Sequence, residues 1–285
     1  MRLSFFLTFI VLFGFGSDEL QSQITVSGSL LNIENNSAVA YATIGVEGRP
    51  YGTHSNIDGT FVLEELKPKD VIQIRHINYH VFSFCIDTLT ECTEIRLTPR
   101  SYNLEAIVIT PKKHKIKQIG YTRGRSVYSS RAGGEFTMLI KNKKYLEAHI
   151  SKIVFEIKRR TTHRNAIKIH LYENNNEQPG SEINLKNNII IIDKTIENKI
   201  IYEPSEKIIF PKEGLFIGYE WLGHIDNKGN LLRNAKSSLN DYTGPGIKCR
   251  RNKSPSIIYR SWNSNWRVVG SGYRACISVL LVQNK

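Results

Sequence analysis

Aromatic side chains gather near the C-terminus of this 285-residue chain, and their types are well suited to holding a ligand. Tyr242 and Tyr259 precede the run Trp262-Asn263-Ser264-Asn265-Trp266. The apolar face of a sugar ring can stack on Trp or Tyr, while neighbouring Asn and Ser side chains hydrogen-bond its hydroxyls. The pattern predicts a ligand-binding group of Tyr242, Tyr259, Trp262 and Trp266. The alternative is that these rings pack inside a β-sandwich core.

The four cysteines, Cys85, Cys92, Cys249 and Cys276, can form two disulfide bonds in an exported chain. Residues 81–87 and 91–97 read as two strands around a turn at 88–89, which would place Cys85 opposite Cys92 across a hairpin. Cys249 with Cys276 follows by elimination, and four buried free thiols are the alternative. No CxxC spacing occurs, which argues against a zinc site or thioredoxin-like chemistry.

Enzyme templates are missing from the sequence, which contains no GxSxG, HExxH or P-loop motif. Glu220 and Asp226 are a pair of carboxylates, but glycosidase chemistry also needs a set separation that a sequence does not give. The run 226–230 has too few carboxylates for a calcium loop and predicts a hairpin turn. We therefore expect a non-catalytic protein with no metal and no cofactor.

The N-terminus predicts export. Met1 and Arg2 are followed by an apolar run from Leu3 to Gly16, after which the chain becomes polar. A membrane-spanning helix needs about 20 apolar residues, so this run is too short to span. It predicts a signal peptide over residues 1–23, with a buried core helix as the alternative. No second long apolar run follows, so we expect a mature chain without a transmembrane segment.

The chain is basic, with 39 Lys and Arg against 26 Asp and Glu and a formal net charge of +13. For an exported protein this charge favours an anionic glycan, an envelope lipid or an acidic protein over nucleic acid. The alternative is that the charge serves solubility alone. An apolar content of 40% indicates a globular protein, and the length suits about two domains.

Residues 24–110 alternate short apolar runs with Gly, Asn and Asp turns, as in a small antiparallel sandwich. The turn at 56–59 ends in Gly59, which can adopt a positive φ, and Phe61 begins the inward face of the next strand. The pattern predicts strands over Ile24–Leu31, Ala42–Glu47, Thr60–Glu64, Val71–His76, Val81–Ile86, Thr93–Leu97 and Ala106–Thr110.

Several stretches of this region occur in a characteristic order: 24–28, 40–46, 52–61, 70–74, 77–79 and 104–109. This order resembles the carboxypeptidase-regulatory-like, transthyretin-like domain of Gram-negative envelope proteins, over residues 24–111. The most specific part is Gly52-Thr53 followed by Asp58-Gly59-Thr60-Phe61. The sequence departs from the family at Ile77-Asn78-Tyr79, where Gly usually precedes Tyr, and in its cysteine pair. The resemblance implies a seven-stranded β-sandwich with an accessory role and no catalytic residues of its own.

Residues 112–134 carry seven Lys and Arg residues and no acidic residue, and glycines interrupt them. This composition predicts a basic linker, either solvated or in contact with an anionic surface.

Residues 135–285 predict a second β-sandwich of jelly-roll type, because apolar residues recur with period two. Ile153, Phe155 and Ile157 share one face of a strand, and Ile167, Ile169 and Leu171 share one face of the next. The predicted strands are His149–Lys158, Ala166–Tyr172, Asn188–Asp193, Lys199–Tyr202, Lys207–Phe210, Leu215–Leu222 and Tyr273–Val282. Residues 167–180 and 210–221 resemble the uncharacterised C-terminal sandwich that accompanies the first domain in some exported proteins.

These features together predict an exported, non-catalytic protein of the periplasm or cell surface of a Gram-negative bacterium. We expect it to bind an anionic glycan or an envelope protein through its second domain. A structural component that docks onto an outer-membrane complex is the alternative, and a polysaccharide hydrolase acting through Glu220 is the less favoured one.

Overall fold

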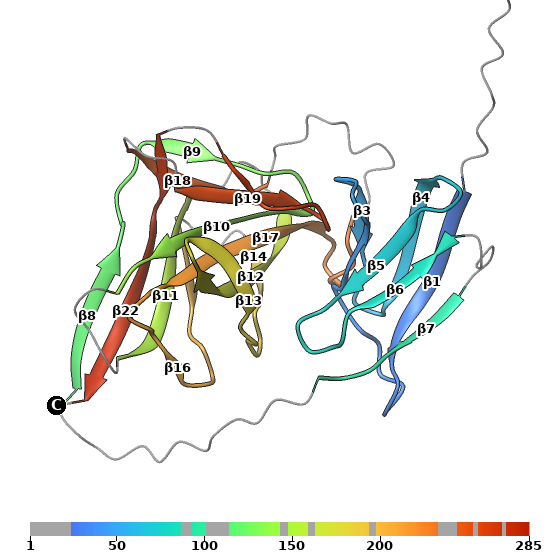
Figure 1. The fold of residues 1–285 in the computed structure, drawn as a ribbon, viewed down its shortest axis with the longest axis horizontal. Helices are drawn as coiled ribbons and strands as arrows, with labels where there is room; N and C mark the ends of the chain where they lie inside the picture. Colours follow the sequence, from blue (N-terminus) through green and yellow to red (C-terminus); the bar gives the residue numbers. More distant parts are fainter. Residues whose placement is uncertain are drawn as a thin grey trace, which may run out of the picture.

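The computed structural model describes residues 24–86, 93–100, 114–142, 148–158, 163–193, 198–232, 244–252, 256–269 and 272–284. Every helix or strand element in these ranges is a β-strand, which confirms the all-β prediction (Figure 1). Among the described residues no helix is long and apolar enough to cross a membrane. The predicted signal peptide and the predicted strand at 106–110 lie outside these ranges.

The first unit, residues 24–100, contains two sheets that enclose one core. A three-stranded sheet has the order β4-β1-β7, and a four-stranded sheet has the order β3-β2-β5-β6. Both sheets contribute to the core, with Leu30 and Phe61 from one and Ile44 and Ile74 from the other. The strands are β1 (Ile24–Asn32), β2 (Thr43–Val46), β3 (Gly52–His54), β4 (Thr60–Leu66), β5 (Val71–Arg75), β6 (Phe82–Cys85) and β7 (Thr93–Leu97).

Two expectations for the first unit need correction. The strands β6 and β7 were expected to form a hairpin, but β6 pairs with β5 in one sheet and β7 pairs with β1 in the other. The chain crosses between the sheets here because both must present an apolar face to the shared core. The β1–β7 pair is also parallel, whereas the turn pattern predicted an antiparallel sandwich. The turn before Phe61 is confirmed, with Gly59 at a φ of 81°.

The second unit, residues 114–284, is built from a seven-stranded and an eight-stranded sheet. The seven-stranded sheet has the order β13-β12-β17-β10-β19-β20, with β14 also paired to β12. Its strands are β10 (Gly134–Ile140), β12 (Arg164–Asn175), β13 (Gln178–Glu182), β14 (Ile189–Ile192), β17 (Leu215–Ile225), β19 (Ile257–Ser261) and β20 (Arg267–Val268).

The eight-stranded sheet has the order β21-β18-β11-β22-β8, and β15, β16 and β9 pair beside this path. Its strands are β8 (His114–Gly120), β9 (Ser126–Tyr128), β11 (His149–Lys158), β15 (Lys199–Tyr202), β16 (Ile208–Ile209), β18 (Gly246–Arg251), β21 (Tyr273–Ala275) and β22 (Ile277–Asn284). The predicted single strand 273–282 is therefore two strands, which meet at Cys276.

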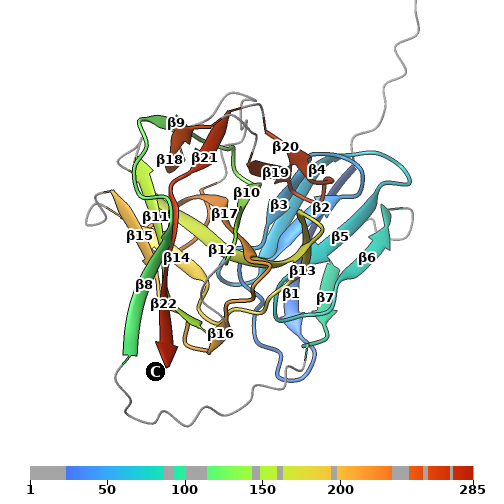
Figure 2. The same ribbon diagram turned by 60° about the vertical axis from the view of Figure 1, so that its left-hand side comes forward.

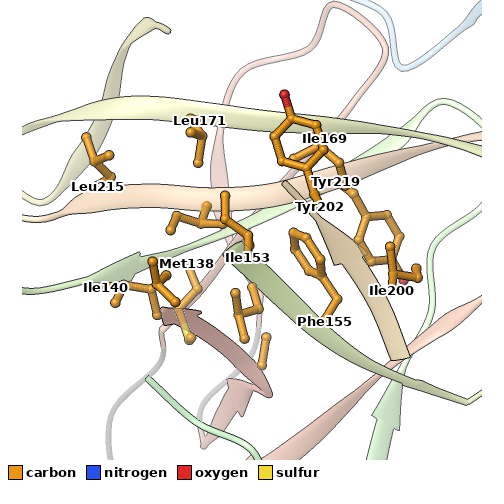
Figure 3. Packing of buried hydrophobic residues seen from close by; sticks show 14 of the residues in the cluster. Met138, Ile140, Ile153, Phe155, Ile169, Leu171, Ile200, Tyr202, Leu215 and Tyr219 are labelled. Carbon is orange, nitrogen blue, oxygen red and sulfur yellow. The ribbon is translucent and has the colours of Figure 1, made fainter. Parts of the chain in front are cut away.

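The core of the second unit lies between these two sheets (Figure 3). The Tyr219 ring meets Phe136 edge-on at a centroid distance of 4.4 Å and Phe155 at 5.6 Å. The Tyr219 hydroxyl donates a hydrogen bond to the Pro245 carbonyl at 2.8 Å, so its one polar atom is satisfied. The two inward faces predicted from period two, on β11 and β12, are both confirmed as core faces.

The predicted basic linker contributes strands to the second unit. Residues 114–120 form β8, which pairs along its length with β22, and 126–128 form β9, which pairs with β18. β8 ends the strand order of the eight-stranded sheet, and lysines are common on such edge strands because they oppose unwanted pairing. The Lys-rich composition that predicted a linker is equally the composition of an edge strand.

The two units pack together through sheet faces. The four-stranded sheet of the first unit lies against the outer face of the seven-stranded sheet (Figures 1 and 2). The Asn263 side-chain amide, for example, donates a hydrogen bond to the Gln73 carbonyl of β5 at 2.8 Å. The eight-stranded sheet lies on the side of the second unit that faces away from the first (Figure 1).

Candidate functional site at the interface of the two units

The outward face of β12 carries polar side chains that are nevertheless buried. Because successive residues of a strand point to opposite faces, Ile167 and Ile169 enter the core while Lys168, His170 and Tyr172 point out of the sandwich. The three polar residues are at most 5% exposed. Buried polar groups need partners, and these find them either on the neighbouring strands or across the interface with the first unit.

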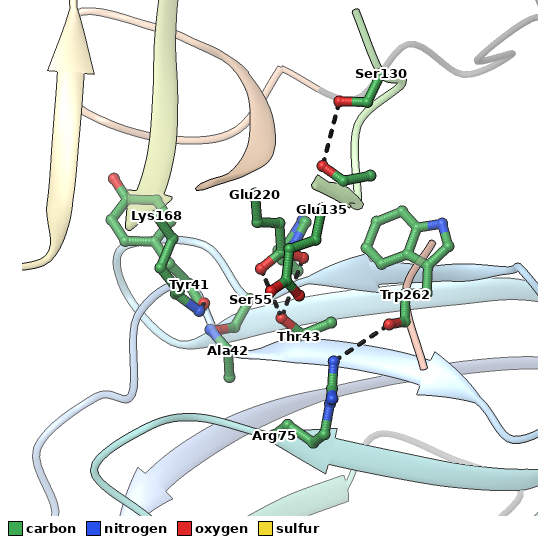
Figure 4. A network of polar contacts seen from close by, with 12 residues as sticks. Tyr41, Ala42, Thr43, Ser55, Arg75, Ser130, Glu135, Lys168, Glu220 and Trp262 are labelled. Atoms are coloured by element: carbon green, nitrogen blue, oxygen red, sulfur yellow. Dashed lines mark hydrogen bonds and ion pairs between the residues drawn. The ribbon is translucent and has the colours of Figure 1, made fainter. Parts of the chain in front are cut away.

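Glu220 of β17 lies at the centre of the interface (Figure 4). Its Oε1 is 2.9 Å from Nε2 of His54, on β3 of the first unit, and its Oε2 is 3.4 Å from Nε2 of His170. The Thr43 hydroxyl donates to the same carboxylate at 3.3 Å. Burial raises the pKa of Glu220, but His54, His170 and Lys168 outweigh it and hold the pKa well below its usual value. The carboxylate is therefore ionised.

Lys168 provides a second bond between the units. Its Nζ donates a hydrogen bond to the Tyr41 carbonyl at 2.7 Å, and the lysine is 2% exposed. Burial lowers the pKa of Lys168, and the carboxylates of Glu220 and Glu182 oppose that shift. The Tyr41 hydroxyl in turn donates to the Gly229 carbonyl at 2.6 Å, so residues of the first unit are bonded to two separate parts of the second.

His170 links Glu220 to a further carboxylate. Its Nδ1 contacts the carboxylate of Glu182, on the neighbouring strand β13. Burial lowers the pKa of His170, but Glu135 and Glu182 outweigh it and raise the pKa to about 9. The reciprocal interaction lowers the pKa of Glu182 to about 2 against the effect of burial. A charged imidazolium therefore lies between two carboxylates at neutral pH.

A second cluster of polar side chains lies beside the Glu220–His170–Glu182 contacts on the same sheet. Nε of Arg260 is 2.8 Å from Oε2 of Glu135, and another guanidinium nitrogen donates to the Tyr172 hydroxyl at 2.7 Å. The Tyr172 hydroxyl donates to Glu135, which closes the triangle. The guanidinium carbon also lies 4.2 Å from the centroid of the Trp266 ring, which is a cation–π contact.

The network is suited to holding the units together, and its inner atoms are closed to a ligand. His54, Lys168 and Glu220 are each at most 3% exposed. In the described part of the chain, no group of three or more His, Cys, Asp and Glu residues is arranged to hold a metal ion. Removing one partner of a buried, hydrogen-bonded ion pair strongly destabilises a protein, so such a pair is suited to fixing the geometry of an interface.

Trp262 lies at this interface. Its ring centroid is 4.7 Å from that of His54, and its carbonyl accepts a hydrogen bond from Arg75 of the first unit at 3.2 Å. A Cβ added to Gly133 would lie 2.2 Å from the ring, and one added to Gly52 would lie 2.9 Å from it. One glycine from each unit thus makes room for the indole.

The other predicted ligand-binding residues are not gathered on one surface. Tyr259 is 9% exposed and belongs to the core cluster, against Tyr128. Trp266 is half-buried and meets the Tyr172 ring edge-on at 5.4 Å. Tyr242 lies outside the described residues. The structure therefore places three of the four rings in three different environments.

Cys249 and Cys276 carry free, buried thiols in the structure instead of the expected disulfide. Cys249 lies opposite Ala275 in the ladder between β18 and β21, so Cys276 is offset from it by one residue. Neighbouring residues of an extended chain point to opposite faces, so the side chains of Cys249 and Cys276 point away from each other. Burial raises the pKa of both thiols. The expected partner of Cys85, Cys92, lies outside the described residues.

The carboxylate pair considered for hydrolysis has two structural roles. Glu220 is the interface carboxylate described above, and Asp226 organises the predicted hairpin turn. Oδ1 of Asp226 accepts hydrogen bonds from the backbone nitrogens of Lys228 and Asn230, both at 2.8 Å.

Most of this network was not predicted from the sequence. His54, Glu135, Lys168, Glu182 and Arg260 were not singled out. Glu135 and Lys168 alternate with apolar residues as on a solvated strand face, and His54 and Glu182 stand in polar, turn-like stretches. One chemical signal for the network was available in the sequence. Three carboxylates and several cations fall on adjacent strands whose other face is apolar, so these charges share one face of the sheet.

Comparisons with known proteins give low similarity. No family model matches the chain, and no curated protein matches it. Solved structures with some similarity include a DUF3823 family protein of Bacteroides ovatus, at 9% identity over 93% of this chain and 97% of the other, with a TM-score of 0.22.

Two further structures show a similar level of likeness. A candidate carbohydrate binding protein of Bacteroides uniformis is 9% identical over 92% of this chain and 99% of its own, with a TM-score of 0.23. BcpA, the major pilin subunit of Bacillus cereus, is 9% identical over 89% and 69%, with a TM-score of 0.21. At these values the function must be inferred from the residues of the chain itself.

Proposed function

We propose that this chain is an exported, non-catalytic binding protein of a Gram-negative cell envelope, in which the first unit supports the second. The observation that carries the proposal is the buried network around His54 and Glu220, which joins the two sheets across the interface. A first unit that is joined in this way keeps the binding surface of the second unit at a fixed distance and angle from any envelope partner of the first unit.

The non-catalytic part of the proposal rests on where the reactive side chains lie. Glu220, His54 and His170 form one cluster of an acid and two bases, and each is paired with another in the closed interface. General acid–base catalysis requires a side chain within hydrogen-bond reach of a substrate proton. These three groups reach only one another and their protein neighbours.

The finer fold assignment belongs to the same proposal. Seven strands in sheets of three and four support a transthyretin-like sandwich for the first unit, and two large sheets around one core support a jelly-roll type for the second. The signal-peptide pattern of residues 1–23 supports export to the periplasm or cell surface.

The ligand of the second unit is proposed to be a glycan. The first unit covers the outer face of the seven-stranded sheet, which leaves the outer face of the eight-stranded sheet for a ligand. The basic composition of the chain supports an anionic glycan over a neutral one.

A binding screen of residues 24–285 against charged and neutral polysaccharides tests this function. We expect saturable binding to at least one polysaccharide, with no release of reducing sugar during long incubation. Release of sugar that is lost in Glu220→Gln would instead establish a hydrolase. Absence of binding to every polysaccharide would reject the glycan ligand.

A second candidate function, docking onto an envelope protein complex, is favoured by β6. This strand ends the order of the four-stranded sheet. Its first residue, Phe82, is 38% exposed, and Val81 just before it is 53% exposed. An edge strand with exposed apolar side chains is suited to pairing with another chain. Affinity capture from envelope extract should return one stoichiometric partner that Phe82→Lys no longer retains. Capture that is equal with both proteins would remove this candidate.

A further inference from the structure

A shallow groove runs over the outer face of the eight-stranded sheet, on the side away from the first unit. Its volume is about 470 Å³. The aliphatic part of its lining comes from Val154 on β11, Ile201 on β15 and Leu280 on β22. Gln118, Thr122, Arg123, Glu156 and Lys199 supply its polar part.

The groove has an excess of positive charge around one buried carboxylate. Glu156 is 7% exposed, and it lies 3.4 Å from Nζ of Lys199 and 3.8 Å from Nζ of Lys248. The exposed Arg123 has no ion-pair partner among the residues that the structure describes. Two lysines thus lie beside this one carboxylate, and Arg123 adds a further cation to the groove lining, so an anionic ligand would be attracted here.

We propose that this groove binds a carboxylate-bearing sugar chain, which makes the glycan ligand of the proposed function a uronate-type polysaccharide. The lining cations Arg123 and Lys199, with Lys248 beside Glu156, suit the carboxylates of such a chain. The Glu156 carboxylate can accept hydrogen bonds from sugar hydroxyls, and the aliphatic floor suits the C–H face of a sugar ring. The inference rests on the proposed function.

An acidic peptide fits this groove less well. Peptides that bind sheets gain most from pairing with an edge strand, where backbone groups are free. The groove lies on a sheet face, and its central strand β11 is already paired with both β15 and β22. A peptide carboxylate would also meet Glu156, whereas a hydroxyl would be a donor to it.

The test compares polygalacturonate, its methyl ester and poly-glutamate as ligands of residues 24–285, measured by isothermal titration calorimetry. The methyl ester keeps the sugar and removes the charge. We expect polygalacturonate to bind at least tenfold more tightly than either of the others. Arg123→Gln combined with Lys199→Gln should weaken that binding at least tenfold.

The matched control is Lys212→Gln combined with Lys228→Gln, which removes the same charge from two exposed turn residues outside the groove. It should change the affinity less than twofold. Equal loss in both double variants, or equal affinity for poly-glutamate, would overturn the site. Glycan binding that neither double variant affects would overturn the groove while leaving the proposed function intact, and failure to bind any glycan would overturn both.

Discussion

Nε2 of His54, in the first unit, lies 2.9 Å from Oε1 of Glu220, in the second, and both side chains are at most 3% exposed. Burial lowers the pKa of His54 and outweighs the nearby carboxylate, so the imidazole is neutral. The contact is therefore a hydrogen bond from a neutral ring to an ionised carboxylate. It joins residues that are 166 positions apart and makes the interface a part of the fold.

Removing the charge of Glu220 should destabilise the protein without affecting ligand binding. Glu220→Gln keeps the size of the side chain but leaves Lys168 and His170 without their shared anion. Loss of one partner of a buried ion pair costs about 3–5 kcal/mol. Urea unfolding measures the change in the free energy of unfolding. Glu177→Gln, at an exposed pair with Lys141, is the control and should leave the midpoint unchanged.

A Glu220→Gln variant as stable as the unmodified protein would show that the network does not hold the interface. Polysaccharide binding should remain within twofold, since the groove lies on the opposite sheet.

Substitution of Trp262 should weaken the interface more than substitution of Trp266. Burying a Trp fully is worth about 3–5 kcal/mol relative to Ala, and Trp262 is half-buried, so we expect about 2 kcal/mol for Trp262→Ala. Thermal unfolding of both alanine variants checks the order. Gly133→Ala should act like Trp262→Ala, because its Cβ would enter the space of the indole.

A different outcome would support the ligand-binding role that the sequence predicts for Trp262. If Trp262→Ala removed polysaccharide binding and left the melting temperature unchanged, Trp262 would be a ligand contact.

Stability should fall as the pH rises from about 6.5 to about 9. The folded pKa of His170 is about 9, above the ordinary value of 6.5, so the stabilisation from its charge is complete below pH 6.5. That stabilisation is lost as the pH passes through about 9. His170→Gln should remove most of the slope of unfolding free energy against pH in this window. An unchanged slope in the variant would mean that His170 is not charged in the folded protein.

Cys249 and Cys276 should be recovered as two thiols. Both are buried and their raised pKa values disfavour the reactive thiolate, so we expect no alkylation in the folded protein. After unfolding in denaturant without reductant, peptide mass spectrometry should find both residues alkylated. A peptide linked through Cys249 and Cys276 would instead support the disulfide expected from the sequence.

The inward faces of the strands could be predicted because they follow a local rule. Ile167, Ile169 and Leu171 alternate with polar residues, and that period alone assigns them to the core. β10 was missed, since its first residues follow the supposed linker and its Glu135 and Thr137 suggest a solvated segment. Both residues are nevertheless buried, and Glu135 is paired with Arg260 of the neighbouring strand β19, which no local pattern reveals.

The interface itself could not be derived from the sequence. Thr43 and His54 lie on one sheet and Glu220 lies on a sheet of the other unit, and their sequence separations carry no periodic signal. The aromatic run at 262–266 shows the same limit. Its composition suits ligand stacking and packing equally, and the glycines that make room for Trp262 lie far from it in the sequence.

Differential scanning calorimetry of residues 24–285 tests most directly whether the buried network joins the two units into one body. We expect a single cooperative transition for the unmodified protein, and two separate transitions for the variant that combines His54→Ala with Glu220→Gln. Two transitions in the unmodified protein, at the same temperatures as in the variant, would contradict the account.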